Sequence, residues 1–330
     1  MVTMKLKKLM CGAIGAGGLL IGATAGAADS GGDYPSRPIR MLVPNAPGSS
    51  VDTLSRIIGN KMSEIVGQQL VIDNRAGAGG IVGMEIAKNA APDGYTLISA
   101  TTAASTVAVL LMKNPTFDPV KDYDHLSQFA VTANVLVVHP SVAAKSVREF
   151  IELAKTRGGK LNMASAGSGS QSHLSGAYFM NVAGMQSVHV PYKGGGPSVA
   201  AVMAGESQWT LTPAPAVMTH VNGGKVRALG HSLPGKSPLM GAIPAIAETL
   251  PGFDYSGWQG FLLPKGVAKP ISEKLRAALL KTAALPDVKT LLAAQATDLV
   301  TSTPDEFRKV VADSMAKNAK VIKAVGLKVE

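Results

Sequence analysis

Residues 38–73 read PIRMLVPNAPGSSVDTLSRIIGNKMSEIVGQQLVID, and they carry the clearest indication of fold class in this chain. The apolar run at 38–44 predicts a strand. Apolar residues from Leu54 to Val66 then recur at helical spacing, and Gly67 follows them as a typical helix end. A second strand is predicted at 69–73. Strand, helix and strand within about thirty-five residues have the size of a βαβ unit with a right-handed crossover.

The same alternation continues along the rest of the chain. Further strands are predicted at 95–100, 134–139, 161–165, 188–191, 209–211, 225–230 and 258–263. Helices are predicted between several of them and in the C-terminal part, at 271–284, at 288–295 and from Thr303 onward. Alternating strands and helices are typical of an α/β protein with parallel sheets.

The N-terminal segment resembles a secretory signal peptide. Met1–Lys8 contains three lysines and no acid, and residues 9–28 are uncharged and consist mostly of alanine and glycine. Small residues at 25–27 fit cleavage after Ala27 or Ala28. The low hydrophobicity of this run disfavours a membrane anchor. We therefore expect residues 1–28 to be removed and the mature protein to be periplasmic.

Composition disfavours several function classes. The formal net charge of +10 is spread over lysines and arginines that alternate with acids, and only 5% of residues are aromatic, which disfavours nucleic-acid binding. Cys11 is the only cysteine and lies in the segment expected to be removed. The mature protein then has no disulfide, no thiolate nucleophile and no cysteine metal site, and we expect no cofactor and no metal ion.

Three loops rich in glycine and serine, at 47–50, 77–80 and 165–170, each lie between a predicted strand and a predicted helix. In open α/β sheets, ligands bind at the carboxyl ends of strands, where such loops lie. The first amide groups of the following helices have no partner within their helix and can bind a carboxylate or phosphate. One such loop is usually only a helix cap, but three together favour an anion site.

From Tyr34 onward the chain resembles the Bug-type receptors of tripartite tricarboxylate transporters, which are extracytoplasmic solute-binding proteins. The resemblance rests on the order and spacing of short strings over some 300 residues. These strings are YPSRPIR (34–40), PG (47–48) with Asp52, NRAGAGG (74–80), PDGYTL (92–97), DP (118–119), SAGSGS (165–170) with HL (173–174), HVPYKG (189–194), GKVRAL (224–229) and PGF (251–253).

This resemblance implies a two-domain periplasmic-binding-protein fold of class α/β. Each domain would be a mainly parallel sheet flanked by helices, with the ligand cleft between the domains. Residues 33–132 plus 253–330 would form domain 1, and 133–252 would form domain 2. The protein would be a monomer that captures a small carboxylate and delivers it to the membrane subunits of a transporter.

The resemblance also implies a set of ligand-binding residues. In domain 1 these are Ala46, Gly48, Ser49, Ala78 and Gly79, with Thr101 and Thr102 near the pocket floor; in domain 2 they are Ser165, Ser170, His173 and Thr212. Relatives that bind amino acids have an acid where Thr212 stands. The absence of this acid favours a mono- or dicarboxylate ligand without an amine. Two roles for His173 remain open, because it either caps and packs its helix or donates to a carboxylate.

Two other functions are weighed from the residues. Residues 230–237 (GHSLPGKS) satisfy the P-loop pattern, but Pro238, Gly241 and Pro244 disfavour the helix that a P-loop requires. The alternative function is a secreted serine hydrolase acting on a small ester or amide.

That hydrolase would use Ser165, Ser168 or Ser170 with His173 or His189. The chain has no G-x-S-x-G elbow, and the sequence indicates no orienting third group. We therefore expect a binding protein rather than an enzyme.

Overall fold

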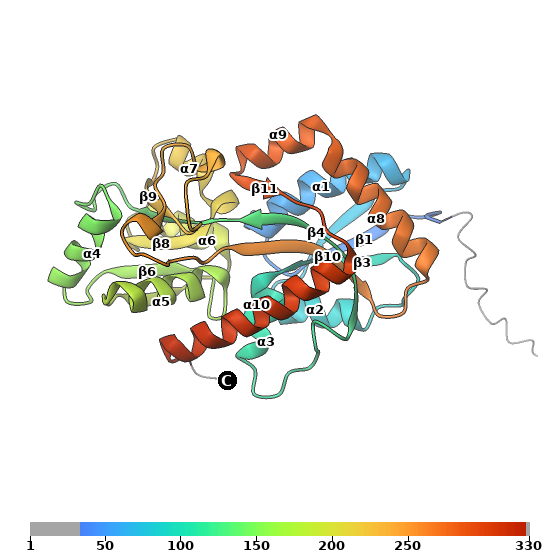
Figure 1. The fold of residues 1–330 in the computed structure, drawn as a ribbon, viewed down its shortest axis with the longest axis horizontal. Coiled ribbons are helices and arrows are strands. Elements are labelled where there is room, and N and C mark those ends of the chain that lie inside the picture. The colour runs from blue at the N-terminus through green and yellow to red at the C-terminus, as the bar shows by residue number, and fades with distance from the viewer. Residues whose placement is uncertain (1–33, 328–330) are drawn as a thin grey trace, which may run out of the picture.

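The computed structural model describes residues 34–327, which form two lobes that lie side by side, each built on one sheet (Figure 1). The predicted signal peptide at 1–28 lies outside these residues. Within the described part of the chain, no helix is long and apolar enough to cross a membrane.

The first sheet has six strands in the order β11-β4-β10-β3-β1-β2. They are β1 (Ile39–Val43), β2 (Leu70–Asn74), β3 (Thr96–Thr101), β4 (Tyr123–Thr132), β10 (Gly257–Pro264) and β11 (Thr297–Leu299). Its helices are α1 (Ser50–Val66), α2 (Ile81–Lys88), α3 (Ala108–Leu110), α8 (Lys269–Ala284), α9 (Pro286–Ala294) and α10 (Pro304–Val325), and the π-helical turn η2 (Ala103–Val107) precedes α3.

The second sheet has five strands in the order β7-β6-β8-β5-β9. They are β5 (Asn134–Val138), β6 (Asn162–Ser165), β7 (Val188–Pro191), β8 (Trp209–Pro213) and β9 (Arg227–His231). Its helices are α4 (Val147–Thr156), α5 (Gln171–Ala183), α6 (Gly195–Met203) and α7 (Met218–Asn222). Short 3-10 turns complete the fold at η1 (Ala78–Gly80), η3 (Ala214–Ala216), η4 (Pro238–Met240) and η5 (Ile246–Glu248).

The predicted βαβ unit is present as β1-α1-β2. The apolar face of α1 places Leu54, Ile58 and Met62 in the same core as Met41 of β1, so burial of that face holds the helix on the sheet. Gly67 ends α1 in the left-handed conformation, at φ 78°, as its position after the apolar pattern indicates.

Both sheets are mixed, and in each of them four strands run in the same direction, which agrees with the prediction of mainly parallel sheets. The pairs β1–β2, β1–β3, β6–β7 and β6–β8 are parallel, whereas β10 runs antiparallel to β3 and β4, and β5 runs antiparallel to β8 and β9. A parallel pair needs a helical crossover between its strands. Strands β4, β5 and β10 instead carry the chain between the lobes, and so they pair antiparallel with their neighbours.

The chain passes between the lobes twice. It leaves through β4 and β5, which are separated by Ala133 alone, and it returns through the segment that leads into β10. Strands of the first sheet lie within 39–132 and 257–299, and those of the second within 134–231. On this basis we propose 33–132 plus 253–330 and 133–252 as the two domains.

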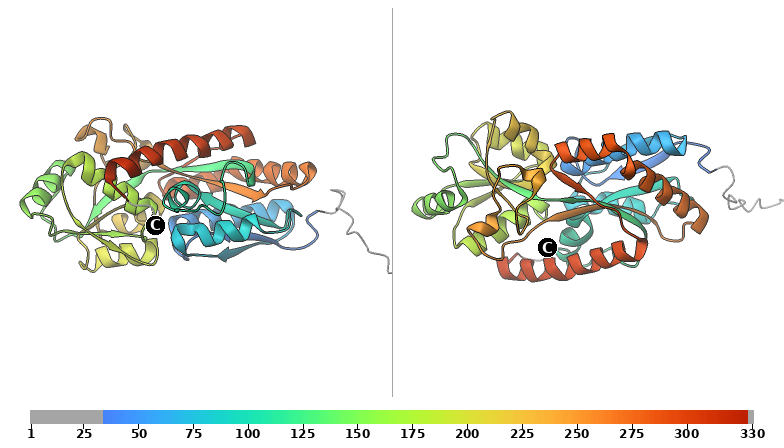
Figure 2. Two further views of the ribbon diagram at one scale, coloured as in Figure 1. Left: turned by 90° about the horizontal axis from the view of Figure 1, so that it is seen from below. Right: turned by 45° about the horizontal axis from the view of Figure 1, so that its top comes forward.

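Helix α10 lies across both lobes (Figure 2). Its first half packs Phe307 and Val311 into a core of the first lobe, whereas Val321 and Ile322 join the main core of the second. Midway, the buried amide of Asn318 accepts a hydrogen bond from the Tyr255 hydroxyl at 2.9 Å and donates to Thr106 Oγ1 at 2.8 Å. Asn318 therefore connects the returning crossover to η2.

We predict that Asn318→Ala lowers the free energy of unfolding by about 2–3 kcal/mol, because it removes two buried hydrogen bonds, one from the Tyr255 hydroxyl and one to Thr106 Oγ1. Urea unfolding of the purified protein measures this change. Lys320→Ala on the exposed side of the same helix is the matched control and should be near neutral. Equal effects of the two substitutions would contradict a structural role for the buried amide.

Candidate functional site

A cavity of about 500 Å³ lies between the two sheets and is lined by residues of both lobes. Its size is typical of a pocket for a small molecule. Four helices begin at its wall, two from each lobe. These are α1 at Ser49–Ser50, α2 at Gly80, α5 at Ser170–Gln171 and α6 at Gly194–Gly195. Their first amide groups and dipoles make this wall favourable for a negative charge.

The structure brings seven of the predicted ligand-binding residues to the cavity wall. They are Ser49, Ala78, Gly79, Thr101, Thr102, Ser170 and Thr212. The other four do not line the cavity. Ala46 lies close to the opposite lobe, where a Cβ atom on Gly194 would be 3.1 Å from its methyl group. Gly48 turns its amide inward, toward Asp52.

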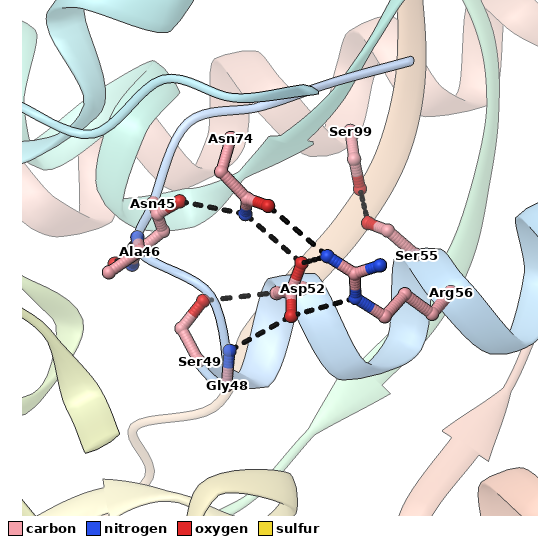
Figure 3. A network of polar contacts seen from close by, with 9 residues as sticks. All are labelled: Asn45, Ala46, Gly48, Ser49, Asp52, Ser55, Arg56, Asn74 and Ser99. Carbon is pink, nitrogen blue, oxygen red and sulfur yellow. Dashed lines mark hydrogen bonds and ion pairs between the residues drawn. The ribbon is translucent and has the colours of Figure 1, made fainter. Parts of the chain in front are cut away.

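The loop before α1 is held by the buried carboxylate of Asp52 (Figure 3). The Gly48 amide donates to Asp52 Oδ2 at 2.9 Å, and Arg56 binds both carboxylate oxygens, at 3.0 and 2.9 Å. Asn74 Nδ2 donates to Asp52 Oδ1 and to the Asn45 carbonyl oxygen, each at 3.0 Å. The carboxylate therefore positions the loop and the start of α1 without lining the cavity itself.

The pKa of Asp52 lies below its ordinary value of 3.8. Burial acts to raise this pKa, but the hydrogen bonds from Arg56, Gly48 and Asn74 and the charge of Arg56 outweigh burial. Asp52 is thus ionised in the folded protein at neutral pH, as a clamp of this kind requires.

The second loop brings its backbone close to the cavity. Ala78 has φ 46°, a left-handed conformation that is unusual for alanine, and Gly80 follows at φ 106°. A Cβ atom on Gly80 would lie only 2.5 Å from the methyl group of Ala104. Only glycine therefore fits at the start of α2, where the chain packs directly on η2.

The third loop is supported from beneath by two stacked histidines. The rings of His173 and His189 lie 3.9 Å apart at 7°. His173 Nδ1 accepts a hydrogen bond from the Gly169 amide at 3.1 Å, and His189 Nε2 lies 2.6 Å from Ser165 Oγ. Since neither Ser165 nor His173 lines the cavity, the packing role of His173 is the one that the geometry supports.

Burial, together with the neighbouring His189, lowers the pKa of His173 from 6.5 to about 4. Burial also lowers the pKa of His189. Both rings are therefore neutral at pH 7, which allows His173 Nδ1 to accept its hydrogen bond.

The Ser165–His189 contact has the distance of a nucleophile and its base, but the rest of a hydrolase site is missing. Ser165 is fully buried behind the loop, and no hydrogen bond to a carboxylate orients His189 within residues 34–327. Where the P-loop pattern occurs, Lys236 is followed by the three-residue turn η4 rather than by a phosphate-binding helix.

The cavity wall carries very little charge. Among the described residues that line it, Lys193 is the only charged side chain, and it is exposed. Thr212 stands at the end of β8 with 1% of its surface exposed, and its hydroxyl has no hydrogen-bond partner in the described part of the chain. The pocket thus presents helix amides, hydroxyl groups and carboxamides.

Several polar wall residues are absent from the set predicted by sequence. The main ones are Thr132, Gln171, Lys193 and Gln259. A signal for two of them exists in the sequence. Gln171 directly follows Ser170, the cap of α5, and Gln259 lies in a predicted strand whose alternate side chains face one side.

Residues 54–327 match the family described as tripartite tricarboxylate transporter family receptor. The chain is 34% identical to protein BugT of Bordetella pertussis over 312 residues, which is 93% of this chain and 96% of BugT. The fold also matches solved periplasmic binding proteins over nearly the whole chain.

Two of the matching structures hold ligands. The structure of Rpa4515 from R. palustris with adipate is 28% identical, with a TM-score of 0.86, and the match covers 89% of this chain and 99% of that one. MatC from Rhodopseudomonas palustris with bound malate is also 28% identical. Its TM-score is 0.83, and the match covers 88% of this chain and 100% of that one.

We predict that Asp52→Asn lowers the free energy of unfolding by roughly 1–3 kcal/mol at pH 7, because it removes the charge that Arg56 and the loop amide bind. Since the pKa of Asp52 is lowered in the folded state, its contribution is complete above pH 3.8 and is lost as the pH falls below that value. Urea unfolding at pH 7 and pH 3 measures both effects.

The exposed Asp313, paired with Lys309 along α10, provides the control, because its replacement by asparagine should change little. If the difference in free energy of unfolding between wild type and Asp52→Asn is as large at pH 3 as at pH 7, the ionised Asp52 does not hold the loop before α1.

We predict a second pH effect at His173. Because its pKa falls from 6.5 to about 4 on folding, the folded state binds fewer protons between these values, and stability decreases as the pH is lowered through this window. His173→Asn keeps an acceptor for the Gly169 amide but does not titrate. Between pH 6.5 and 4, wild type should lose about 2–3 kcal/mol more than the variant. Parallel curves would show that His173 does not titrate in this way.

Proposed function

Because this chain belongs to the tripartite tricarboxylate transporter receptor family, we propose that it is a periplasmic binding protein for a small mono- or dicarboxylate that lacks an amine. The two lobes close on the ligand, and the protein delivers it to the membrane subunits of a transporter. We propose that the chain is exported by residues 1–28, cleaved after Ala27 or Ala28, and acts as a monomer.

The convergence of four helix N-termini on one cavity carries this proposal. Two come from each lobe, so an anion between them contacts both lobes and stabilises the closed arrangement. Hydrogen bonds to an ionised group contribute about 1.5–3 kcal/mol each. A few of them account for an affinity in the micromolar range, which corresponds to about −8 kcal/mol.

The absence of an acid from the described wall supports a ligand without an amine. An ammonium group in the cavity would lose its hydration with no carboxylate to replace it, which costs free energy. The family resemblance places Thr212 at the position of an acid in relatives that bind amino acids, and its neutral hydroxyl gives no such compensation. Lys193 at the exposed edge adds positive potential that favours the approach of an anion.

A receptor fits these observations better than a serine hydrolase. The nucleophile–base pair of Ser165 and His189 lies behind the wall of the cavity, with its serine fully buried. A bound carboxylate therefore does not reach it. We infer that the protein binds and releases its ligand unchanged and uses no cofactor.

We predict that amine-free carboxylates stabilise the mature protein in a thermal-shift panel of propionate, butyrate, succinate, adipate, glutamate and aspartate. A ligand at one hundred times its dissociation constant adds about 2.7 kcal/mol, and the midpoint should rise by several degrees. Denaturing and refolding the protein beforehand removes any ligand carried through purification. Glutamate or aspartate binding more tightly than every amine-free acid would contradict the proposed class.

The variant Thr212→Asp sharpens this test by restoring a carboxylate to the wall. It should weaken binding of the best amine-free acid at least tenfold, which is about 1.4 kcal/mol of charge repulsion. Thr156→Asp makes the same change on the exposed surface of α4 and should leave affinity unaltered.

A further inference from the structure

Three polar side chains on the cavity wall are buried, and each has at least one polar atom without a hydrogen-bond partner within residues 34–327. Gln171 is 9% exposed, and neither its Oε1 nor its Nε2 is hydrogen-bonded. Gln259 is 3% exposed and leaves Oε1 unpaired, as Thr212 does with its hydroxyl. A buried polar group without a partner lowers the stability of the protein. Two carboxamides in this state on the wall of one pocket point to a ligand that hydrogen-bonds to them.

The two carboxamides come from different lobes but lie over the same strand. Gln259 projects from β10, and its Nε2 donates to Ser50 Oγ at 3.3 Å. Gln171 is the first residue of α5 and reaches across to Gly257, two residues earlier on β10. A Cβ atom on Gly257 would lie 3.3 Å from Gln171 Nε2 and 3.3 Å from Thr132 Oγ1.

Residues i and i+2 of a strand face the same side, about 6.5 Å apart. The Gln171 amide therefore occupies the side-chain position that Gly257 leaves open, directly beside Gln259. A single small polar group of the ligand, placed between the two amides, is within reach of both. Such a group contacts both lobes at the strand that joins them.

The unpaired atoms of the Gln171 and Gln259 carboxamides determine which ligand group can bind between them. A hydroxyl donates one hydrogen bond and accepts others, so it can donate to Gln259 Oε1 and accept from Gln171 Nε2. A second carboxylate only accepts, and it would face an unpaired amide oxygen with no cation nearby, since Lys193 lies at the exposed edge. Desolvating that second charge without a counter-ion is costly.

We propose that Gln171 and Gln259 form a hydroxyl-recognition subsite and that the ligand is a hydroxycarboxylate. This inference rests on the proposed function, with the carboxylate bound by the helix N-termini and the hydroxyl by the two carboxamides. Gln171 and Gln259 determine specificity within the carboxylate class.

Calorimetric titration of matched acids tests the subsite. The pairs are propionate with lactate, butyrate with 3-hydroxybutyrate, and succinate with malate, each differing by one hydroxyl group. In at least one pair the hydroxylated acid should bind at least tenfold more tightly, because the unsubstituted acid leaves the two amides unpaired. Unsubstituted acids that bind equally well or better in every pair would overturn the subsite and leave the carboxylate receptor standing. No binding by any acid would overturn both.

Substitutions locate the effect in the two carboxamides. Gln171→Leu and Gln259→Leu should each weaken the hydroxylated acid at least tenfold and its unsubstituted partner less than threefold. Gln186→Leu, the same change at an exposed position of the second lobe, should alter neither affinity. Equal losses for both acids would contradict hydroxyl recognition. If a leucine variant does not fold, Gln171→Asn and Gln259→Asn are used instead, because each shortens the side chain by one methylene group. We expect the same loss of preference for the hydroxylated acid over its unsubstituted partner.

Discussion

The antiparallel pairing of β4 with β10 is the constraint on which the arrangement of the two lobes depends. These two strands carry both connections between the lobes, and they lie side by side in the first sheet. Both strand connections therefore lie at one place, and the cavity opens beside it. Thr132 at the end of β4 and Gly257 at the start of β10 line that cavity. The strand pair that joins the lobes is thus also part of the ligand site.

Around this junction, buried hydrogen bonds and ring stacking fix the orientation of the loops, which apolar packing alone does not do. Asp52 holds the loop before α1, the two stacked histidines hold the loop before α5, and Asn318 holds η2 against the returning crossover. None of these side chains lines the cavity. Each one holds a segment in which neighbouring residues line the cavity. The chemistry of the site is therefore delivered mostly by main chain and neutral side chains, whose placement depends on charges and rings behind them.

The sequence was sufficient for elements whose side chains follow one period. The unit β1-α1-β2 and the end of α1 at Gly67 are confirmed. Strand β4 was missed because His125, Ser127 and Gln128 interrupt its apolar alternation although all three are buried. The strands that run against the others in each sheet were not predicted, because strand direction depends on how the chain passes between the lobes. Ser165 and His173 were assigned to the site from the family resemblance, and matching positions in a loop do not tell which face of that loop a side chain supports.

Helix α10 is anchored at its start in the first lobe and at Val321 and Ile322 in the second. Two lobes joined only by paired strands would rotate with little resistance. With this helix in place, a wide separation of the two lobes must either bend a helix of 22 residues or remove its last turns from the hydrophobic core of the second lobe. Both distortions raise the free energy steeply with angle. In the proposed cycle of opening and closing, the C-terminal helix would limit how far the two lobes separate when no ligand is bound.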